Sequence, residues 1–219
     1  MDKKLQKEKL QNYLAEQKLH RIEALSDGVF SIAMTLLVLD IRIPAGSLIT
    51  SELDLLHSFA SIGPKLLSYF LSFLTLGIFW TGHTTQFTYI VKTDRLLNWI
   101  TIFFLMFVSL LPFTTAFLSE HITFRLSIAL YWLNLFFIGT LLLTNWIYAW
   151  NRGYLLETLP EPEVINKAIR NRIITAQLLY AGAALLCFIN NYISIIAIVI
   201  TQLYRLIFYS HKTKSYETK

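Results

Sequence analysis

Two ionisable residues stand out because they lie in stretches of sequence that are otherwise apolar. Asp27, which follows Ser26, lies in the stretch 22–43, and His83 lies in the stretch 65–91. An uncompensated charge in the middle of a bilayer costs about 2.5–3.5 kcal/mol on insertion scales, so this carboxylate needs a partner or water. Such residues mark either ties between helices or routes for ions and protons.

Catalytic chemistry is not indicated by any other pattern in the chain. The sequence has no nucleophile elbow, no phosphate-cradling glycine loop and no pair of carboxylates deep in an apolar stretch. The 5 histidines lack helical ligand spacing, and the single cysteine, Cys187, is remote from them. We therefore expect a protein that is not an enzyme and has no metal site and no cofactor.

The composition indicates an integral membrane protein. The chain has 219 residues, of which 55% are hydrophobic and only 15% are charged, and its mean hydropathy is +0.52. The formal net charge of +5 could indicate a nucleic-acid partner. The basic residues, however, cluster beside the apolar stretches, which is typical of membrane topology, so we expect no nucleic-acid partner.

Six apolar segments are long enough to cross a membrane. A hydrocarbon core about 30 Å thick needs about 20 residues of helix. The long apolar stretch near the C-terminus contains FINNY (188–192), whose adjacent asparagines indicate a turn at a membrane surface. Residues 42–64 are expected to form one long outer loop. The sequence thus predicts an all-α integral membrane protein with six transmembrane helices, at about 22–43, 65–91, 96–118, 126–150, 172–189 and 192–209.

Lysine and arginine predict the orientation of these helices. Of the 19 such residues, only Arg42, Lys65 and Arg125 fall in segments that would lie outside if the N-terminus is cytoplasmic. We therefore expect a multi-pass protein of the cell (inner) membrane with both termini in the cytoplasm. Its predicted regions are a charged N-terminal segment along the membrane surface (1–20), a six-helix transmembrane domain (21–210) and a cytoplasmic C-terminal tail (211–219).

The first two predicted helices place their polar residues at similar depths. Asp27 is six residues into its helix, about 9 Å, and His83 is nine residues from the same membrane face, about 13 Å. Trp80 shares the histidine's face, and Asn98 opens the third helix on the same side. We expect Ser26 and Asp27 to form an inter-helix polar cluster with Trp80, His83 and Asn98. A lone histidine is more often a packing residue, and that alternative stays open.

A narrow apolar stripe follows the first helix on a different face. Ile32, Leu36 and Leu39 lie at positions i, i+4 and i+7. At 100° per residue, Asp27 lies about 140° from Ile32 and about 180° from Leu36. The stripe and the carboxylate therefore face different environments. From residue type alone, lipid or the protein core is the ordinary environment of such a stripe.

Over residues 21–118 the sequence resembles the potassium-channel family of endosomes and lysosomes, transmembrane protein 175, and more closely its prokaryotic homologues. The family's first helix opens with arginine, three residues, then phenylalanine, serine and aspartate. Arg21, Ser26 and Asp27 match this motif, whereas Leu25 replaces the phenylalanine. Three further segments look like the family: GVFSIAMTLLVLDIRIP, SFLTLGIFWTGHTTQF and FVSLLPFTTAF.

The resemblance implies a potassium-selective, leak-type channel with six helices per chain. Prokaryotic members assemble as homotetramers in which the first helix of each subunit lines a central pore. The family's constriction of bulky apolar residues falls here on Ile32, Leu36 and Leu39, and Thr35 could add a ring of hydroxyls. Such a constriction gates by expelling water. The implied partners are copies of this chain, membrane lipid and K⁺ as the permeant ion, with other monovalent cations as candidates.

Two other functions remain as alternatives. A proton- or solute-coupled transporter would use Asp27 and His83 as a relay. The sequence, however, lacks the glycine- or proline-interrupted helix pairs and the inverted repeat that many transporters contain. A membrane scaffold without transport is compatible with the sequence, but it leaves the polar cluster without a use.

Overall fold

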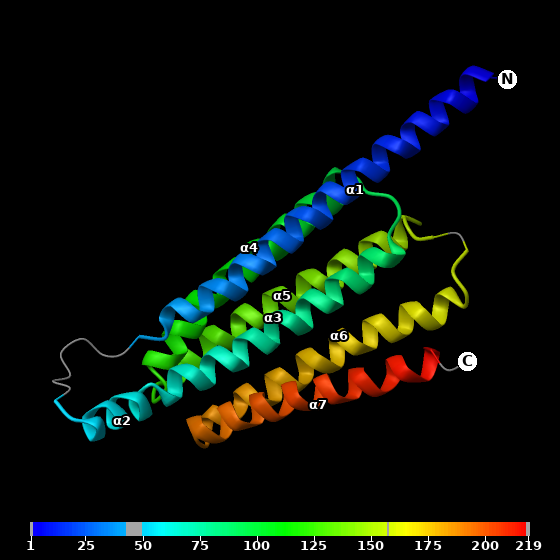
Figure 1. Ribbon diagram of the computed structural model, residues 1–219. Helices are drawn as coiled ribbons and strands as arrows, with labels where there is room; N and C mark the ends of the chain where they lie inside the picture. Colours follow the sequence, from blue (N-terminus) through cyan, green and yellow to red (C-terminus); the bar gives the residue numbers. More distant parts are fainter. Residues whose placement is uncertain (1, 43–49, 157, 218–219) are drawn as a thin grey trace.

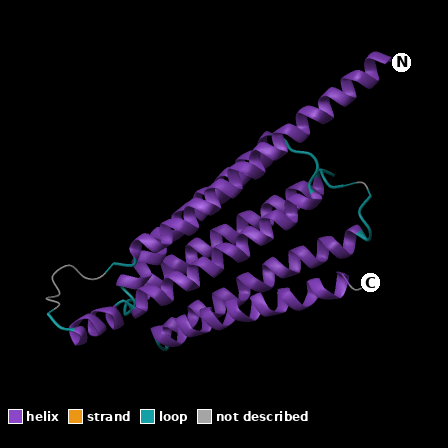
Figure 2. Ribbon diagram, viewed as in Figure 1, coloured by secondary structure: helices purple, strands orange, loops and turns teal. Residues whose placement is uncertain are grey.

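The computed structural model describes residues 2–42, 50–156 and 158–217, and the side chains of residues 18–42, 50–156 and 158–205. Within these residues the chain is helical apart from turns and an isolated antiparallel β-bridge between Ile90 and Leu155 (Figure 2). The elements are α1 (Asp2–Leu36), η1 (Leu37–Asp40), α2 (Glu52–Ser61), α3 (Gly63–Tyr89), α4 (Arg95–Glu120), α5 (Arg125–Asn151), α6 (Pro162–Leu185), η2 (Leu186–Phe188) and α7 (Asn191–Glu217).

The long helices form an elongated bundle in which they run along a common direction (Figure 1). Both termini lie at one end of this bundle, together with the α3–α4 and α5–α6 connections. The opposite end carries α2 and the α4–α5 and α6–α7 turns. We call these the terminal end and the α2 end. The N-terminal turns of α1 continue past the terminal end without a break in the helix.

Among the described residues, five helices are long and apolar enough to cross a membrane. They lie at Lys18–Asp40, Gly63–Tyr89, Arg95–Glu120, Arg125–Asn151 and Pro162–Phe188. The chain is therefore an all-α, multi-pass membrane protein, as its composition predicts. α7 occupies the place of the sixth predicted span but is not among these five, so a sixth crossing stays a prediction. The position of residues 1–20 relative to a membrane surface also stays a prediction.

The predicted loop 42–64 is wrong in one respect, because it contains the helix α2. Ser51 caps this helix by accepting a hydrogen bond from the backbone N–H of Asp54 at 3.2 Å. The Asp54 carboxylate in turn accepts hydrogen bonds from the hydroxyls of Thr50 and Ser51 at 2.9 and 2.8 Å. Serine followed three residues later by an acidic residue resembles a capping box, and this signal could have revealed the helix.

The turn between the last two helices lies where the asparagine pair predicts it. α6 ends at Leu185, the short 3₁₀ turn η2 follows, and α7 begins at Asn191. The Asn191 side-chain amide donates hydrogen bonds to the backbone carbonyls of Ile122 and Thr123 at 3.3 and 2.5 Å. The α6–α7 turn is thereby fixed against the α4–α5 turn at the α2 end of the bundle.

A buried polar network ties α7 to the centre of the bundle. Thr115 on α4 donates to Ser72 on α3 at 2.7 Å, and Ser72 lies 3.2 Å from the hydroxyl of Tyr131 on α5. Gln202 on α7 donates to the hydroxyl of Thr75 on α3. Buried polar groups cost free energy unless they are paired, so these contacts favour one alignment of the four helices.

Candidate functional site

The membrane part of α1 has one buried face and one face that the rest of the chain leaves open. On the buried face, Phe30, Ala33 and Leu37 pack into the main apolar core. The residues of the predicted stripe are exposed instead: Ile32 by 60%, Leu36 by 43% and Leu39 by 57%. Three large apolar side chains on one open face need another covering, which is lipid or further copies of the chain.

The backbone is wound more tightly directly after the last residue of α1. Residues Leu37–Asp40 form a 3₁₀ turn, in which side chains three residues apart eclipse each other. Leu39 is therefore more nearly in line with Leu36 than the α-helical spacing predicts. Leu37, which periodicity turns away from the stripe, is 3% exposed and belongs to the core.

Thr35 is exposed on the same side of α1 as the stripe. Its hydroxyl donates a hydrogen bond to the backbone carbonyl of Ile32 at 2.9 Å. Because the hydroxyl proton is used in this way, the side chain presents its oxygen lone pairs to whatever lies against this face. An oxygen in that position is a suitable ligand for a partly dehydrated cation.

The structure brings Asp27 and Trp80 together across the α1–α3 interface. The indole Nε1–H of Trp80 donates to the carboxylate Oδ1 of Asp27 at 2.8 Å. Both residues are exposed in the single chain, so Asp27 is less buried than the sequence predicts. The hydrogen bond gives the charged carboxylate a partner away from the stripe and ties α1 to α3.

His83 packs between aromatic rings, and no hydrogen bond joins it to Asp27. Its ring stacks on those of Phe104 and Phe87, with centroid distances of 5.2 and 4.4 Å. It is 1% exposed, and its Nε2 has no hydrogen-bond partner within the described part of the chain. His83 is thus a packing residue in this structure.

The other members of the predicted polar cluster bind elsewhere. Ser26 is buried and donates to the backbone carbonyl of Ile22 in its own helix at 2.8 Å. Asn98 accepts a hydrogen bond from the hydroxyl of Thr93 at 2.5 Å. Arg21 is exposed on α1, a turn and a half before Asp27. The observed cluster is therefore the pair of Asp27 and Trp80, with His83 packed nearby.

A second polar cluster, at the terminal end, was not predicted. Asp94 caps α4 by accepting from the backbone N–H of Leu97 at 2.8 Å, and its other oxygen accepts from the hydroxyls of Tyr148 and Tyr154 at 2.5 and 3.2 Å. Arg152 donates to the Tyr148 hydroxyl at 3.2 Å. Burial opposes ionisation of Asp94, but these donors and the Arg152 charge outweigh it and lower the pKa of the carboxyl. An aspartate directly before an apolar helix is a known N-cap signal.

Replacing Asp94 with alanine is expected to lower the free energy of unfolding by about 1–3 kcal/mol, because a helix cap and two tyrosine contacts are lost. The lowered pKa means that the ionised carboxyl stabilises the fold above its ordinary pKa of 3.8 and that this contribution is lost as the pH falls through the lowered value. Thermal unfolding of the purified protein at neutral and acidic pH measures both effects. Lys92→Ala in the same turn is the control, and an equal loss there would contradict the role of Asp94.

At the α2 end, the turn η1, which continues α1, is fixed by contacts with α3 and α4. Ser119 donates to the Asp40 carboxylate at 3.0 Å, and the Lys65 ammonium lies 3.4 Å from the Asp40 backbone carbonyl. Lys65 also forms a salt bridge with Glu120 at 3.8 Å. The stripe thus lies between these contacts and the Asp27–Trp80 pair, so hydrogen bonds within the chain hold the helix near both ends of the stripe.

Comparison with known proteins finds a protein family that residues 21–112 match. They match the family described as the endosomal/lysosomal potassium channel TMEM175. A potassium channel of Streptomyces collinus is 40% identical over 102 residues, covering 47% of this chain and 48% of that protein. The endosomal/lysosomal proton channel TMEM175 of Danio rerio is 41% identical over 97 residues, covering 42% of this chain and 19% of that protein.

The chain aligns with about half the length of its bacterial relatives, 48% and 50% for two of them. The similarity in fold covers more of the chain than the similarity in sequence does. The crystal structure of a lysosomal potassium-selective channel TMEM175 homolog from Chamaesiphon minutus has a TM-score of 0.76 and 28% sequence identity, covering 87% of this chain and 97% of that chain. The resemblance predicted from the sequence is therefore confirmed: this chain is similar to the TMEM175 family, by sequence over residues 21–112 and by fold over most of its length.

Proposed function

We propose that this protein is a potassium-selective cation channel of the leak type, in which α1 of each subunit lines the central pore of a homotetramer. The observation that carries the proposal is the open apolar face of α1, where Ile32, Leu36 and Leu39 are exposed while the opposite face is buried. Relatives named as potassium channels support the choice of ion. A single α1 cannot enclose a pore, so several copies are needed.

We infer that the stripe serves both gating and ion selection. Four such faces around an axis form a hydrophobic constriction, which impedes ions by expelling water. An ion must give up part of its hydration shell to pass, and this costs less for K⁺ than for the smaller Na⁺. Each Thr35 hydroxyl donates its hydrogen bond to the backbone carbonyl of Ile32. Its oxygen atom can therefore replace some of the water that the ion loses.

The proposed topology has six crossings, with both termini in the cytoplasm and the protein in the cell (inner) membrane. Both termini lie at one end of the bundle, which requires an even number of crossings if α7 spans the membrane antiparallel to α6 (Figure 1). Permeation along such a path is not a chemical reaction and needs no cofactor, with K⁺ as the transported ion.

The transporter alternative is less well supported by the geometry. A proton relay needs Asp27 and His83 to exchange a proton directly or through water. Asp27 instead accepts from Trp80, and the His83 ring lies between the rings of Phe87 and Phe104. Relatives named as proton channels make proton permeation a second candidate activity, which the same experiment can measure.

Ion flux into liposomes that contain the purified protein tests the proposal. We expect a potassium gradient to drive a flux well above that of empty liposomes and above the flux driven by an equal sodium gradient. A pH-sensitive dye inside the liposomes measures proton entry in the same preparation. The absence of any cation flux would refute the proposed function.

The oligomeric state is a separate prediction. Native mass spectrometry of the protein in detergent should give a mass about four times the 25.4 kDa of one chain, because four α1 helices are needed around the proposed pore. Chemical cross-linking in membranes, stopped at short times, should give a ladder that ends at four. A monomer in both measurements would contradict a pore lined by one helix per chain.

A further inference from the structure

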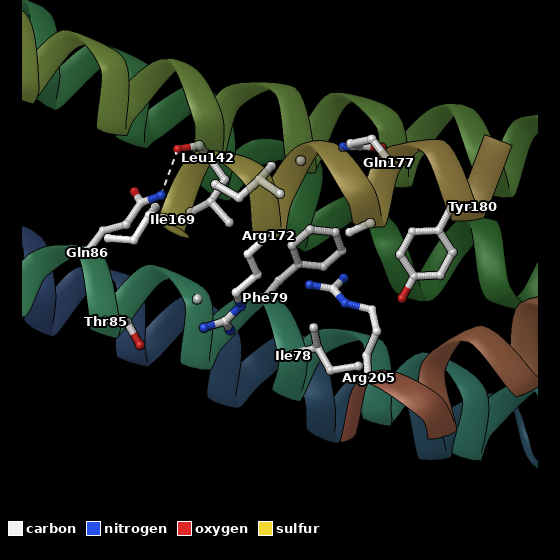
Figure 3. A pocket seen from close by; sticks show the side chains of 14 residues that line it. Ile78, Phe79, Thr85, Gln86, Leu142, Ile169, Arg172, Gln177, Tyr180 and Arg205 are labelled. Atoms are coloured by element: carbon white, nitrogen blue, oxygen red, sulfur yellow. Dashed lines mark hydrogen bonds between the residues drawn. The ribbon is translucent and has the colours of Figure 1, made fainter. Parts of the chain in front are cut away.

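A cavity lies away from α1, between α3, α5, α6 and α7 at the side of the bundle. Within the described part of the chain, 14 residues line it, and its volume is about 30 Å³ (Figure 3). It is partly open to the surroundings. Sites for drug-sized molecules measure roughly 300–1,000 Å³, so this cavity has room for one small charged group rather than a whole ligand. It suits one end of a longer molecule whose remainder lies outside.

Two arginines from neighbouring helices line this cavity. Arg172 comes from α6 and extends towards α3, whereas Arg205 comes from α7 and points towards Arg172 and the ring of Phe79 (Figure 3). The lining described here contains no aspartate or glutamate. Arg172 also interacts within the chain, but a guanidinium has five N–H donors and can serve more than one acceptor. Two adjacent positive charges in an apolar setting favour an anion between them.

The two arginines lie at matching depths on antiparallel helices. Arg172 is the last charged residue of α6, since no charge follows it up to Leu185. Arg205 is the first charged residue of α7, which has none between Asn191 and Tyr204. Both therefore mark the border between the uncharged and the charged part of their helix, on the side of the terminal end. Arginine side chains at such a border extend towards the lipid head groups.

Two further residues shape the cavity. Gln86, 1% exposed, donates to the backbone carbonyl of Leu142 at 3.0 Å, while its Oε1 has no hydrogen-bond partner among the described residues. A buried acceptor of this kind favours a ligand that carries a hydroxyl. At Gly82, an added Cβ would lie 3.4 Å from Leu142 and 3.9 Å from Arg172, so the glycine keeps this wall of the cavity free.

We propose that this cavity binds the phosphate group of an anionic phospholipid from the leaflet at the terminal end of the bundle. Arg172 and Arg205 would hold the phosphate oxygens through paired N–H donors, as guanidinium groups do in other phosphate sites. The acyl chains would remain in the bilayer beside α6 and α7. The proposal does not depend on ion conduction, because the cavity lining contains none of the α1 residues whose side chains the structure describes.

Lipid titration of the full chain in non-ionic detergent tests this proposal. Dioctanoyl phosphatidylglycerol carries a phosphate, a net negative charge and hydroxyls, whereas dioctanoyl phosphatidylcholine has the same phosphate without net charge. Native mass spectrometry gives the affinity for each lipid. We expect phosphatidylglycerol to bind at least about fivefold more tightly, and Arg172→Gln or Arg205→Gln to weaken it about fivefold each, since a basic residue near a membrane contributes about 1 kcal/mol.

Arg170→Gln is the matched control, because Arg170 is exposed on the same helix and does not line the cavity. It should leave the affinity within about twofold, whereas an equal loss would overturn the site. Equal affinity of the unaltered chain for the two lipids would overturn the proposal as well. If inorganic phosphate at the same concentration displaces phosphatidylglycerol, the site binds free anions and the lipid assignment is wrong.

The test stays decisive if a glutamine variant does not fold. Arg172→Lys and Arg205→Lys keep the charge and lose the paired donors, so they should bind both lipids less tightly but still prefer phosphatidylglycerol to phosphatidylcholine. Thermal unfolding without lipid establishes whether each variant is folded. Lysine variants that lose the preference while remaining folded and in the same oligomeric state would contradict an electrostatic site.

Discussion

Leu36→Asn is expected to raise the potassium current about tenfold, which corresponds to lowering the barrier in the constriction by about 1.4 kcal/mol. A polar side chain wets the narrowest part of an apolar pore, so the cost of expelling water falls. The permeability ratio of potassium to sodium should fall towards one, since ions then pass with more of their hydration shell. Ile32→Asn should act in the same direction, because Ile32 lies on the same exposed face. Bi-ionic reversal potentials of the reconstituted protein measure the ratio.

The controls for this prediction come from the same helix. Val38→Ala is a suitable match, because Val38 is exposed by 48% but lies off the stripe. Leu37→Ala is unsuitable, since Leu37 is buried and its truncation would cost about 2–5 kcal/mol of stability. We expect Val38→Ala to leave current and selectivity unchanged. Equal shifts for Leu36 and Val38, with the oligomer intact, would refute the assignment of this face to the pore.

Thr35→Val separates the hydroxyl from the apolar constriction. Valine is β-branched like threonine and has nearly the same size but offers no oxygen, so the width of the proposed pore changes little. If the hydroxyl oxygen replaces water around the passing ion, selectivity should fall while the current changes less than in Leu36→Asn. An unchanged reversal potential would show that Thr35 does not face the ion.

Breaking the Asp27–Trp80 contact is expected to reduce the stability of the folded assembly by about 1.5–3 kcal/mol, the usual range for a hydrogen bond to a charged group. Trp80→Phe removes the donor and leaves the carboxylate without its observed partner. Asp27→Asn removes the charge but keeps an acceptor, so its effect should be smaller. Unfolding measurements and the fraction of intact oligomer give the two costs.

The double variant tests whether the two residues act through each other. If they do, Asp27→Asn combined with Trp80→Phe should cost less than the sum of the single changes. Selectivity should stay close to that of the unaltered protein, because Asp27 lies away from the stripe. Loss of ion discrimination with folding and conductance intact would place Asp27 on the ion path instead.

Helix geometry explains how much of the α1–α3 contact could be predicted from the sequence. The rise per residue fixes the depth of each side chain, so Asp27 was expected near Trp80 and His83. The rotation of α3 about its own axis depends on how the whole bundle packs, and no short motif encodes it. That rotation directs Trp80 towards the carboxylate and turns His83 into the aromatic core.

Local hydrogen bonds account for the other differences. Asn98 was expected to reach Asp27, but the hydroxyl of Thr93, five residues away, binds its amide oxygen first. Ser26 was expected to join the cluster, yet a serine within a helix often bonds to the carbonyl four residues before it. Hydropathy predicted the positions of the long helices well. It did not predict α2, because the leucines of this helix face outward and its start is marked only by a short polar motif.

The unbroken length of α1 has a mechanical consequence. About 38 Å of helix lies between Asp2 and Asp27, and about 14 Å between Asp27 and Leu36, at 1.5 Å per residue. If α1 tilts as a rigid rod about its contact with Trp80, it acts as a lever with unequal arms. A sideways movement of about 3 Å at the protruding tip then moves Leu36 by only about 1 Å in the opposite direction. A rigid α1 would therefore pass a movement of its tip to the stripe at about one third of its size, within the limits set by the buried Leu37 and by the contact between Asp40 and Ser119.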